Sequence, residues 1–376
     1  MLFNLLIARF ISIEDYGMLS FSDTIVSFII VLGGVGLHTI GIRDVSQQKK
    51  SLEYIYSNIV AIRTILVAFF GLGIFLLLFK GYRVPFLIYT YLFTICQVML
   101  IDWFYIAIDK KRKLATAFFI AIVSLFIGIG TLYLRDDFTI STIRFVQLIS
   151  LFLASSYLVL NSNKLFSYRF ISRNSVISYM KDGYPLVSAY LFQQSYYLGI
   201  PLAIVSFVGF KEQGYFAVGS RLAFVFVTLR NLLIQPLSKY IYTLSYKKYI
   251  KLHNRYLPFL IGLAICFYFV VSYFDETLIN LLFGDKYLVN EVFVVFRIMM
   301  LLPIIYFLFI GHATIFTANG NQSVYAKLCF CSFLMFMLSL FVIIMFSLHN
   351  VIIYAGLFVA VELFIFLGLD FNIRKK

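Results

Sequence analysis

Two stretches of this chain repeat one pattern: "ISIEDYGMLSFSDTI", from Ile11 to Ile25, and "GFKEQGYFAVGSRL", from Gly209 to Leu222. Each has an apolar run, charged residues, an aromatic residue beside a glycine, and a second long apolar run. Superposing Gly17 on Gly214 gives an offset of 197 residues in a chain of 376. A pattern that recurs at this distance predicts a protein built from two related halves.

The composition indicates that lipid surrounds most of the chain. Apolar residues make up 62% of the sequence and charged residues 13%, and the mean hydropathy is +0.95. Soluble domains are about half apolar and about a quarter charged, and a 43.5 kDa globule could not hide this much apolar surface from water. We therefore expect an all-α polytopic membrane protein.

Apolar segments long enough to cross a membrane follow one another along the chain. A spanning helix needs about 20 apolar residues, and eleven segments reach this length: residues 19–41, 57–79, 85–108, 114–134, 143–161, 183–208, 214–238, 256–274, 292–317, 325–347 and 350–370. A twelfth, "MLFNLLIARFIS", has only 12 residues. We expect it to be the second half of a truncated first helix that begins upstream of Met1. The connecting loops are too short for a catalytic domain, so no enzyme is expected.

Lys and Arg are distributed unequally between the two sets of alternate loops. Of the 31 basic residues, 20 fall in one set together with the C-terminal tail, and six fall in the opposite set. Loops rich in Lys and Arg face the cytoplasm, so both ends of a twelve-helix chain are expected there. The net charge of +14 reflects this topology, and we expect no nucleic-acid partner.

The repeat and the topology together predict two lobes. Both copies of the pattern lie in the first outer loop of a six-helix set and on the same side of the membrane. We expect an N-terminal lobe over residues 1–162 (helices 1–6), a cytoplasmic linker over residues 163–182 and a C-terminal lobe over residues 183–376 (helices 7–12). Two pseudo-symmetric lobes around a central cavity are typical of alternating-access transporters.

Four stretches carry a family resemblance: residues 5–44, "YPLVSAYLF" at 184–192, "KEQGYFAVGSRL" at 211–222 and "LINLLFGDKYLVNE" at 278–291. In this order they resemble Wzx-type polysaccharide flippases of the multidrug/oligosaccharidyl-lipid/polysaccharide exporter superfamily. The resemblance implies that the protein flips an undecaprenyl-diphosphate-linked oligosaccharide, such as an O-antigen or capsule unit, to the outer leaflet of the bacterial cytoplasmic (inner) membrane. Two features depart from the family: the first helix is incomplete, and "QQSYYLGIPLAI" at 193–204 lacks an aspartate that relatives often carry.

The same resemblance implies the partners of the protein. They are the lipid-linked oligosaccharide, the surrounding membrane lipids and, as candidates, the polysaccharide polymerase and chain-length machinery. No resident cofactor is expected, although H⁺ or Na⁺ could drive the cycle. The four cysteines lie inside apolar segments without metal-ligand spacing, so we expect no metal site and no disulfide framework.

Charged side chains inside the predicted helices are the first candidates for function. A charge at the centre of a membrane helix costs about 2.5–3.5 kcal/mol on insertion scales, so it normally faces a cavity or a partner. Eight charges lie within or at the edges of the helices: Arg9, Asp23, Arg63, Asp102, Arg221, Arg230, Arg297 and Glu362. Five are arginines, which favours an anionic cargo because a guanidinium binds phosphate oxygens bidentately.

Helical phase selects the cavity candidates among them. At about 100° per residue, two polar stripes appear on the pseudo-equivalent second and eighth helices. They are Asp23, Ser27, Gly34 and His38 on one, and Arg221, Thr228 and Gln235 on the other. We expect these stripes to face a cavity, with Arg221 against the anionic head group. The predicted cavity residues are Arg9, Asp23, Arg63, Gln194, Arg221, Arg230 and Gln235.

Several charges keep a second interpretation. Arg230 lies about 180° from Arg221 on its helix and could instead pair with a neighbour in its own lobe. Arg63 is close enough to the cytoplasmic boundary to reach the interface with its long side chain. Asp102, Arg297 and Glu362 are candidates either for ion coupling or for ion pairs.

Three other functions are compatible with many helices. A cation-coupled multidrug exporter of the same superfamily would favour acidic residues and few arginines in its cavity. A flippase for the peptidoglycan precursor would usually have additional helices. A membrane glycan polymerase would need a large outer loop with Arg and carboxylate clusters, and the sequence contains no such loop.

Overall fold

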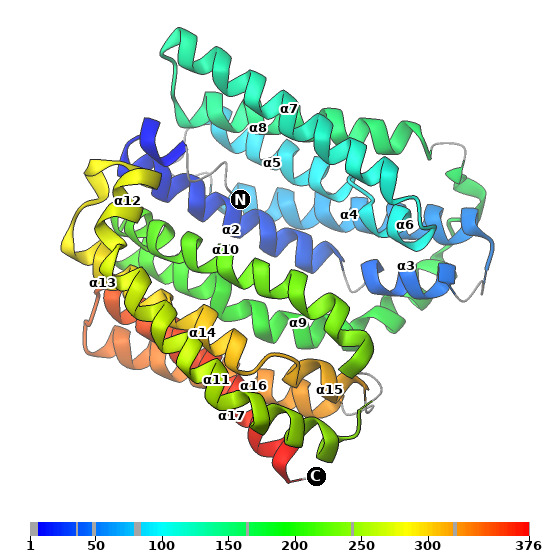
Figure 1. Ribbon diagram of the computed structural model, residues 1–376. Helices are drawn as coiled ribbons and strands as arrows, with labels where there is room; N and C mark the ends of the chain where they lie inside the picture. The colour runs from blue at the N-terminus through cyan, green and yellow to red at the C-terminus, as the bar shows by residue number, and fades with distance from the viewer. Residues whose placement is uncertain are drawn as a thin grey trace. The chain divides into compact units, whose positions relative to one another are not determined.

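The computed structural model describes residues 7–34, 37–46, 50–78, 84–162, 165–241, 244–318 and 322–375. Within these residues all regular structure is helical, and Figure 1 shows that long helices make up most of the chain. Nine helices in the described part are long and apolar enough to cross a membrane. The predicted all-α polytopic membrane fold is therefore confirmed.

The eleven complete predicted spans all fall on helices of the structure. In the first half these are α2 (Ile13–Gly34), α3 (Leu37–Ser46), α4 (Leu52–Leu78), α5 (Val84–Val98), α6 (Asp102–Ala107), α7 (Lys111–Arg135) and α8 (Ile140–Leu160). In the second half they are α9 (Arg173–Phe207), α10 (Phe210–Ile241), α11 (Tyr246–Tyr273), α12 (Asp275–Phe283), α13 (Asn290–Met299), α14 (Leu301–Leu308), α15 (His312–Ala318), α16 (Gln322–Met345) and α17 (Val351–Arg374). The short helices η2 (Tyr168–Phe170) and η3 (Asp285–Tyr287) lie in connections. Residues 1–6 of the truncated first helix lie outside the described part, and residues 7–10 are helical.

The fourth predicted span of each half is broken, which the hydropathy pattern did not predict. The span at 85–108 divides into α5 and α6, and the span at 292–317 divides into α13, α14 and α15. Gly311, in the second break, has φ +89°, a backbone conformation that glycine adopts without a steric penalty. Each broken span ends in a short helix that begins with a polar residue, Asp102 in α6 and His312 in α15.

The chain forms two compact units. The larger unit contains Met1–Phe21 and Phe192–Lys376, and the smaller unit contains Ser22–Leu191. The lobe boundaries at residues 162 and 183 remain a prediction. The second half of the predicted linker is helical, because α9 begins at Arg173 and continues without a break to Phe207.

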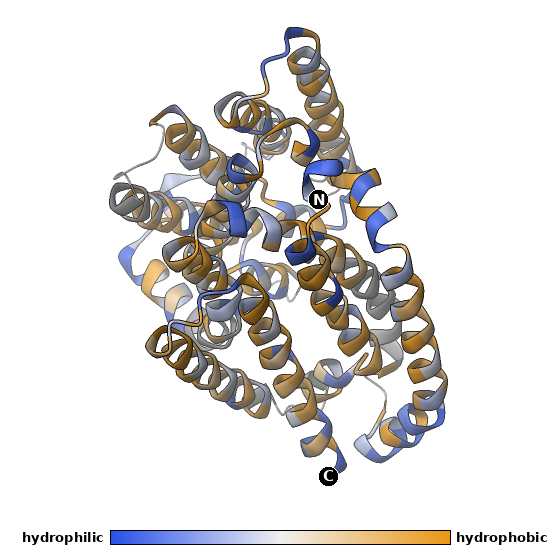
Figure 2. Ribbon diagram, turned by 90° about the vertical axis from the view of Figure 1, so that its left-hand side faces the viewer, coloured by the Kyte–Doolittle hydropathy of each residue, from blue (hydrophilic) through white to orange (hydrophobic). Residues whose placement is uncertain are grey.

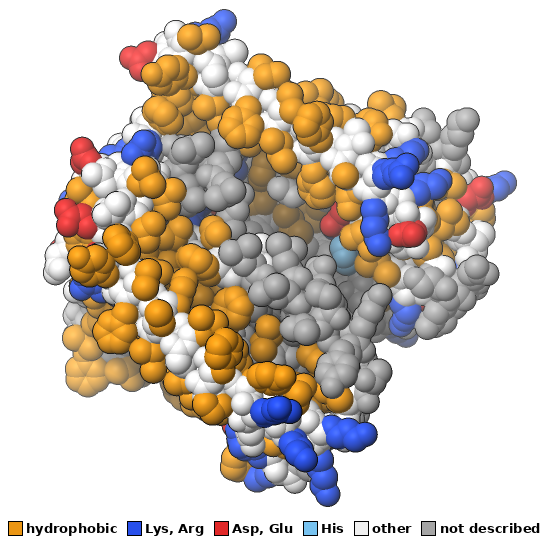
Figure 3. All heavy atoms as spheres, in the orientation of Figure 1, with side chains coloured by type: hydrophobic (Ala, Val, Ile, Leu, Met, Phe, Trp, Pro, Cys, Tyr) orange, Lys and Arg blue, Asp and Glu red, His pale blue; other side chains and the backbone are white. Residues whose placement is uncertain are grey.

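Apolar side chains cover the outer faces of several helices. Only 11% of the most apolar window of α7 and 6% of that of α11 are buried inside the protein. Figure 2 shows hydrophobic residues along most of the helix length and hydrophilic residues gathered at helix ends and connections. In Figure 3, Lys and Arg side chains gather near the ends of α7 and α11, and apolar side chains cover their flanks. Apolar surface of this extent requires hydrocarbon rather than water as its surroundings.

The two copies of the repeated motif contact each other within the larger unit. A Cβ atom on Gly17 would lie 1.8 Å from the carbonyl oxygen of Phe210, and one on Gly214 would lie 2.4 Å from the carbonyl oxygen of Ile13. The Phe21 and Phe210 rings pack edge to face beside this contact. Glycine at both positions lets the backbones of α2 and α10 approach this closely, which explains why both copies carry it.

Candidate functional site

Glu362 is the centre of a buried hydrogen-bonded group in the larger unit. Its side chain, near the middle of α17, is 1% exposed. The hydroxyls of Tyr196 and Tyr197, both on α9, donate to the same carboxylate oxygen, Oε1, at 2.8 and 2.7 Å. The Tyr306 hydroxyl on α14 lies 2.9 Å from that of Tyr197 and also hydrogen-bonds to Glu362. Three helices thus converge on one carboxylate, which we call the Glu362 centre.

The sequence around the Glu362 centre explains its position. A carboxylate inside hydrocarbon needs donors, and tyrosine provides a hydroxyl donor on an otherwise apolar ring. Phe358, one turn before Glu362 on α17, packs its ring edge to face against Tyr196 and Tyr197 at 5.6 and 4.8 Å. This packing holds both rings with their hydroxyls at the carboxylate. The centre is therefore a buried, hydrogen-bonded site that can hold a negative charge, a proton or a small cation.

Arg63 forms a second buried polar site, in the smaller unit. Its side chain on α4 is 7% exposed, so it does not reach the interface as one interpretation of the sequence proposed. It interacts electrostatically with Asp102, the first residue of α6, and Asp102 Oδ1 lies 3.7 Å from His38 Nδ1. Among the described residues, no group accepts a hydrogen bond from Arg63 Nε or Nη1. The guanidinium therefore has donors left for an anion.

Asp23 is paired with Arg144, a buried arginine at the start of the predicted span 143–161. Arg144 lies inside α8, and its side chain is 0% exposed. Its Nη2 donates to Asp23 Oδ1 at 2.8 Å and to the Ser22 hydroxyl. The rings of Phe86 and Phe93 flank the guanidinium at 5.7 and 4.9 Å. The cavity role of Asp23 remains a prediction, and its carboxylate also stabilises the buried Arg144 charge.

Arg9 lies just before the first copy of the repeated motif, and Arg221 lies within the second copy. Arg9 Nη2 donates to the carbonyl oxygen of Asn280 at 2.9 Å, and the Arg221 guanidinium lies 5.2 Å from the Tyr16 ring centroid. Lys286 donates to the carbonyl oxygens of Arg9 and Ile11, and burial lowers the pKa of its ammonium group. The result is a basic group at the predicted outer end of the unit.

The other predicted site residues have separate surroundings. Arg297 Nε donates to Asp275 Oδ2 at 2.7 Å and forms an ion pair with it. Gln194 is half-buried on α9. The side chains of Arg230 and Gln235 lie outside the described part of the chain. The structure thus distributes the ten predicted residues over several places rather than one.

Sequence reasoning missed one group of potential metal ligands. It consists of His253, His312 and Asp370 in the larger unit. A ring nitrogen of each histidine and a carboxylate oxygen of Asp370 all lie within 4.8 Å of one another. The sequence predicted no metal site, and that prediction rested on the spacing of the cysteines, not on these three residues. The sequence does show a polar residue, His312, inside an apolar span. Only the fold shows that His253 and Asp370 lie beside it.

Comparison with solved structures places the fold among the MATE transporters. The chain is similar to a multidrug resistance MATE family transporter of the MOP superfamily in an inward-facing conformation, with a TM-score of 0.69, 11% identity, and coverage of 100% of this chain and 92% of that chain. It is similar to the Vibrio cholerae MATE transporter VcmN in the bent form, with a TM-score of 0.59, 16% identity, and coverage of 99% and 92%. It is also similar to a MATE protein in the bent conformation, with a TM-score of 0.59, 11% identity, and coverage of 100% and 91%.

Sequence comparisons add no closer relative. No family model and no curated relative matches the sequence. The structural neighbours are MATE transporters of the superfamily that the sequence resemblance indicated. At these identities the likeness shows the fold alone.

Proposed function

We propose that this protein is an alternating-access transporter that flips an undecaprenyl-diphosphate-linked oligosaccharide from the cytoplasmic to the outer leaflet. The fold supports alternating access, since one similar solved structure is a transporter in an inward-facing conformation. The ordered sequence resemblance to Wzx-type flippases supports the cargo. The membrane is then the bacterial inner membrane, and the polymerase and chain-length machinery are the candidate partners.

Arg63 is the observation that carries the proposed cargo. It is a charged side chain buried in a spanning helix, where a charge is costly, and Asp102 is the carboxylate that interacts with it. Nε and Nη1 have no acceptor among the described residues. A phosphate oxygen supplies both the negative charge and the acceptors that this fork of donors requires. The neighbouring His38 and Asp102 side chains are 44% and 36% exposed, so the site is open to a ligand.

The Glu362 centre is our proposed coupling site. A carboxylate that exchanges a proton or Na⁺ changes its charge at each turn of the cycle, and the tyrosine hydroxyls remain as ligands in both states. A hydroxyl can donate to the carboxylate or offer its oxygen to a cation. The two sites therefore have separate roles: Arg63 for the anionic cargo and Glu362 for the driving ion.

A cation-coupled multidrug exporter is the second candidate. It is favoured by the structural likeness, because one of the similar structures is described as a multidrug resistance transporter. The Glu362 centre fits a cation-coupled exporter as well as a flippase. Arg63 distinguishes the two, since a buried guanidinium with free donors repels a cationic drug and attracts a diphosphate.

Replacing Arg63 by Ala is expected to reduce surface polysaccharide by about tenfold or more in a flippase-deleted host that supplies the cognate glycan. A hydrogen bond to a charged group contributes about 1.5–3 kcal/mol, and each 1.4 kcal/mol corresponds to about tenfold. Arg63→Lys keeps the charge but not the fork, so an intermediate level is expected. Surface polysaccharide is measured with a glycan-specific lectin at matched protein levels.

Arg169→Ala is the matched control, because Arg169 is an exposed arginine of the same unit and pairs with Glu53 only at 4.0 Å. It should leave the surface polysaccharide unchanged. If Arg63→Ala matches the unsubstituted protein, the guanidinium does not bind cargo. If the unsubstituted chain never restores polysaccharide but protects the host from cationic drugs, the exporter is the better account.

A further inference from the structure

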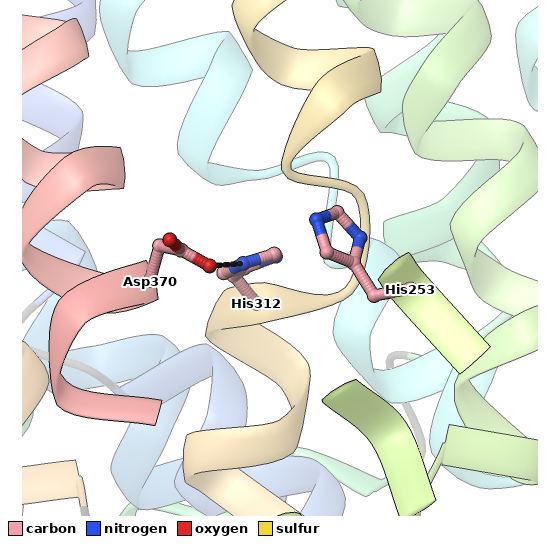
Figure 4. A group of neighbouring side chains, drawn as sticks. All are labelled: His253, His312 and Asp370. Carbon is pink, nitrogen blue, oxygen red and sulfur yellow. Dashed lines mark hydrogen bonds and ion pairs between the residues drawn. The ribbon is translucent and has the colours of Figure 1, made fainter. Parts of the chain in front are cut away.

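The His253–His312–Asp370 cluster connects three helices of the larger unit. His253 comes from α11, His312 from the start of α15 and Asp370 from α17 (Figure 4). His312 Nε2 lies 3.2 Å from Asp370 Oδ1, and the His253 and His312 rings meet edge to face with centroids 4.8 Å apart. Gly311 turns the chain immediately before His312 and places the imidazole between the other two helices.

The hydrogen bonds around His312 leave its Nε2 facing a carboxylate. The Tyr249 hydroxyl lies 2.8 Å from the carbonyl oxygen of Ile310 and 2.9 Å from His312 Nδ1. The carbonyl can only accept, so the hydroxyl donates its single proton there, and its oxygen accepts from Nδ1–H. Nε2 then lies against Asp370 Oδ1. A positive charge between these two atoms stabilises the pair, and it is either a proton on Nε2, which makes His312 an imidazolium ion-paired with Asp370, or a bound cation.

His253 adds a third ligand without a competing partner. Its side chain is 8% exposed, and the His253 ring makes no hydrogen bond in the described part of the chain, although both of its nitrogens are polar. Figure 4 shows the ring next to His312, on the side opposite Asp370. Arg374 Nε binds the other oxygen of Asp370, Oδ2, at 2.7 Å, which orients the carboxylate and leaves Oδ1 for the cluster.

We propose that His253, His312 and Asp370 bind a divalent cation of the late first transition row, such as Zn²⁺. Two imidazole nitrogens and one carboxylate oxygen form a donor set that these ions prefer. Tetrahedral Zn²⁺ holds such ligands about 3.4 Å apart, so small side-chain rotations close the present spacing of at most 4.8 Å. Water completes the fourth position.

The second sphere has the arrangement that metal-binding histidines require. A histidine ligand usually donates its other ring N–H to an acceptor that fixes its tautomer, and the Tyr249 oxygen does this for His312. A bound cation would fix α15 against α11 and α17 at the end of the unit that the sequence predicts to be cytoplasmic. This assignment does not depend on the transported cargo.

The test is a titration of the full chain, purified without a histidine tag, treated with a chelator and reconstituted in lipid nanodiscs. Co²⁺ is added and followed by visible absorption, and Zn²⁺ is then added to displace it. We expect one saturable site per chain and a higher melting temperature with Zn²⁺ than without it. Replacing a ligand, as in His253→Ala or Asp370→Asn, should weaken binding by more than the about 10–100-fold expected for the second-sphere variant Tyr249→Phe.

His349→Ala is the matched control, since it removes one histidine whose ring stacks on Phe207 away from the cluster, and it should bind Co²⁺ like the unsubstituted chain. Size-exclusion chromatography checks that each variant folds. The proposal is wrong if the unsubstituted chain shows no saturable site, or if His253→Ala binds equally well. His312 would then be an imidazolium that donates from Nδ1 to Tyr249 and from Nε2 to Asp370, in a network that needs no cation.

Discussion

Replacing Glu362 by Gln is expected to reduce transport strongly and leave the protein folded. Glutamine has the shape of glutamate, and its oxygen can still accept from Tyr196 and Tyr197, which both donate to Oε1. It cannot take up a proton or replace the negative charge that attracts Na⁺. Removing a charge from the membrane interior also relieves a cost of about 2.5–3.5 kcal/mol. Transport under an imposed H⁺ or Na⁺ gradient should fall by about tenfold or more, the equivalent of about 1.4 kcal/mol, with an unchanged or higher melting temperature.

The control for this variant is Glu53→Gln, which neutralises a half-exposed carboxylate at the start of α4. It should transport at the unsubstituted rate. A purely structural role for Glu362 gives a different pattern: the melting temperature would fall by several degrees, and transport would fall only with the amount of folded protein. Normal transport by Glu362→Gln under both gradients would show that the driving ion does not bind at this carboxylate.

Replacing Gly17 by Ala should destabilise the protein by about 3 kcal/mol, the upper end of typical overpacking costs. The new Cβ would lie 1.8 Å from the Phe210 carbonyl oxygen and 2.8 Å from the Gly214 nitrogen. These are backbone atoms, so no side-chain rotation can relieve the clash, and α2 and α10 must separate. We expect a lower melting temperature in nanodiscs and a parallel loss of transport. Gly214→Ala should act in the same direction, since its Cβ would lie 2.4 Å from the Ile13 carbonyl oxygen.

Gly130→Ala is the matched control on α7, because a Cβ there has nothing within 4 Å. Alanine is a better helix former than glycine by about 1 kcal/mol, so the melting temperature should stay the same or rise. If Gly17→Ala and Gly130→Ala have the same melting temperature, the close contact between the two motifs does not contribute to stability.

The sequence predicted the helices well because the membrane imposes their length. Every complete span found by hydropathy lies on one or more helices of the structure, and the repeat points to Gly17 and Gly214 without showing that they meet. The breaks at 99–101 and 309–311 were missed, since the apolar character continues through both. Hydropathy measures the surroundings of a residue and not whether its backbone hydrogen bonds continue.

The candidate site was predicted less completely, because helical phase does not show which neighbour a side chain meets. Hydropathy identified Glu362 and Arg63 as charges inside predicted spans. The tyrosines that contact Glu362 and the Asp102 carboxylate beside Arg63 come from other helices. Arg144, the partner of Asp23, is 121 residues away in sequence. Pairing at such separations depends on how helices pack, and a single sequence carries no direct signal of it.

The cargo decides the function of this protein, and translocation in proteoliposomes measures it directly. The purified chain is reconstituted with a fluorescent undecaprenyl-diphosphate oligosaccharide, and an impermeant glycosidase outside the vesicles detects molecules that cross from the inner leaflet. We predict translocation well above that of protein-free vesicles, and a rate about tenfold or more lower for Arg63→Ala, equivalent to about 1.4 kcal/mol or more. A rate equal to that of protein-free vesicles, together with transport of a cationic dye by the same vesicles, would contradict the account and identify the chain as a drug exporter.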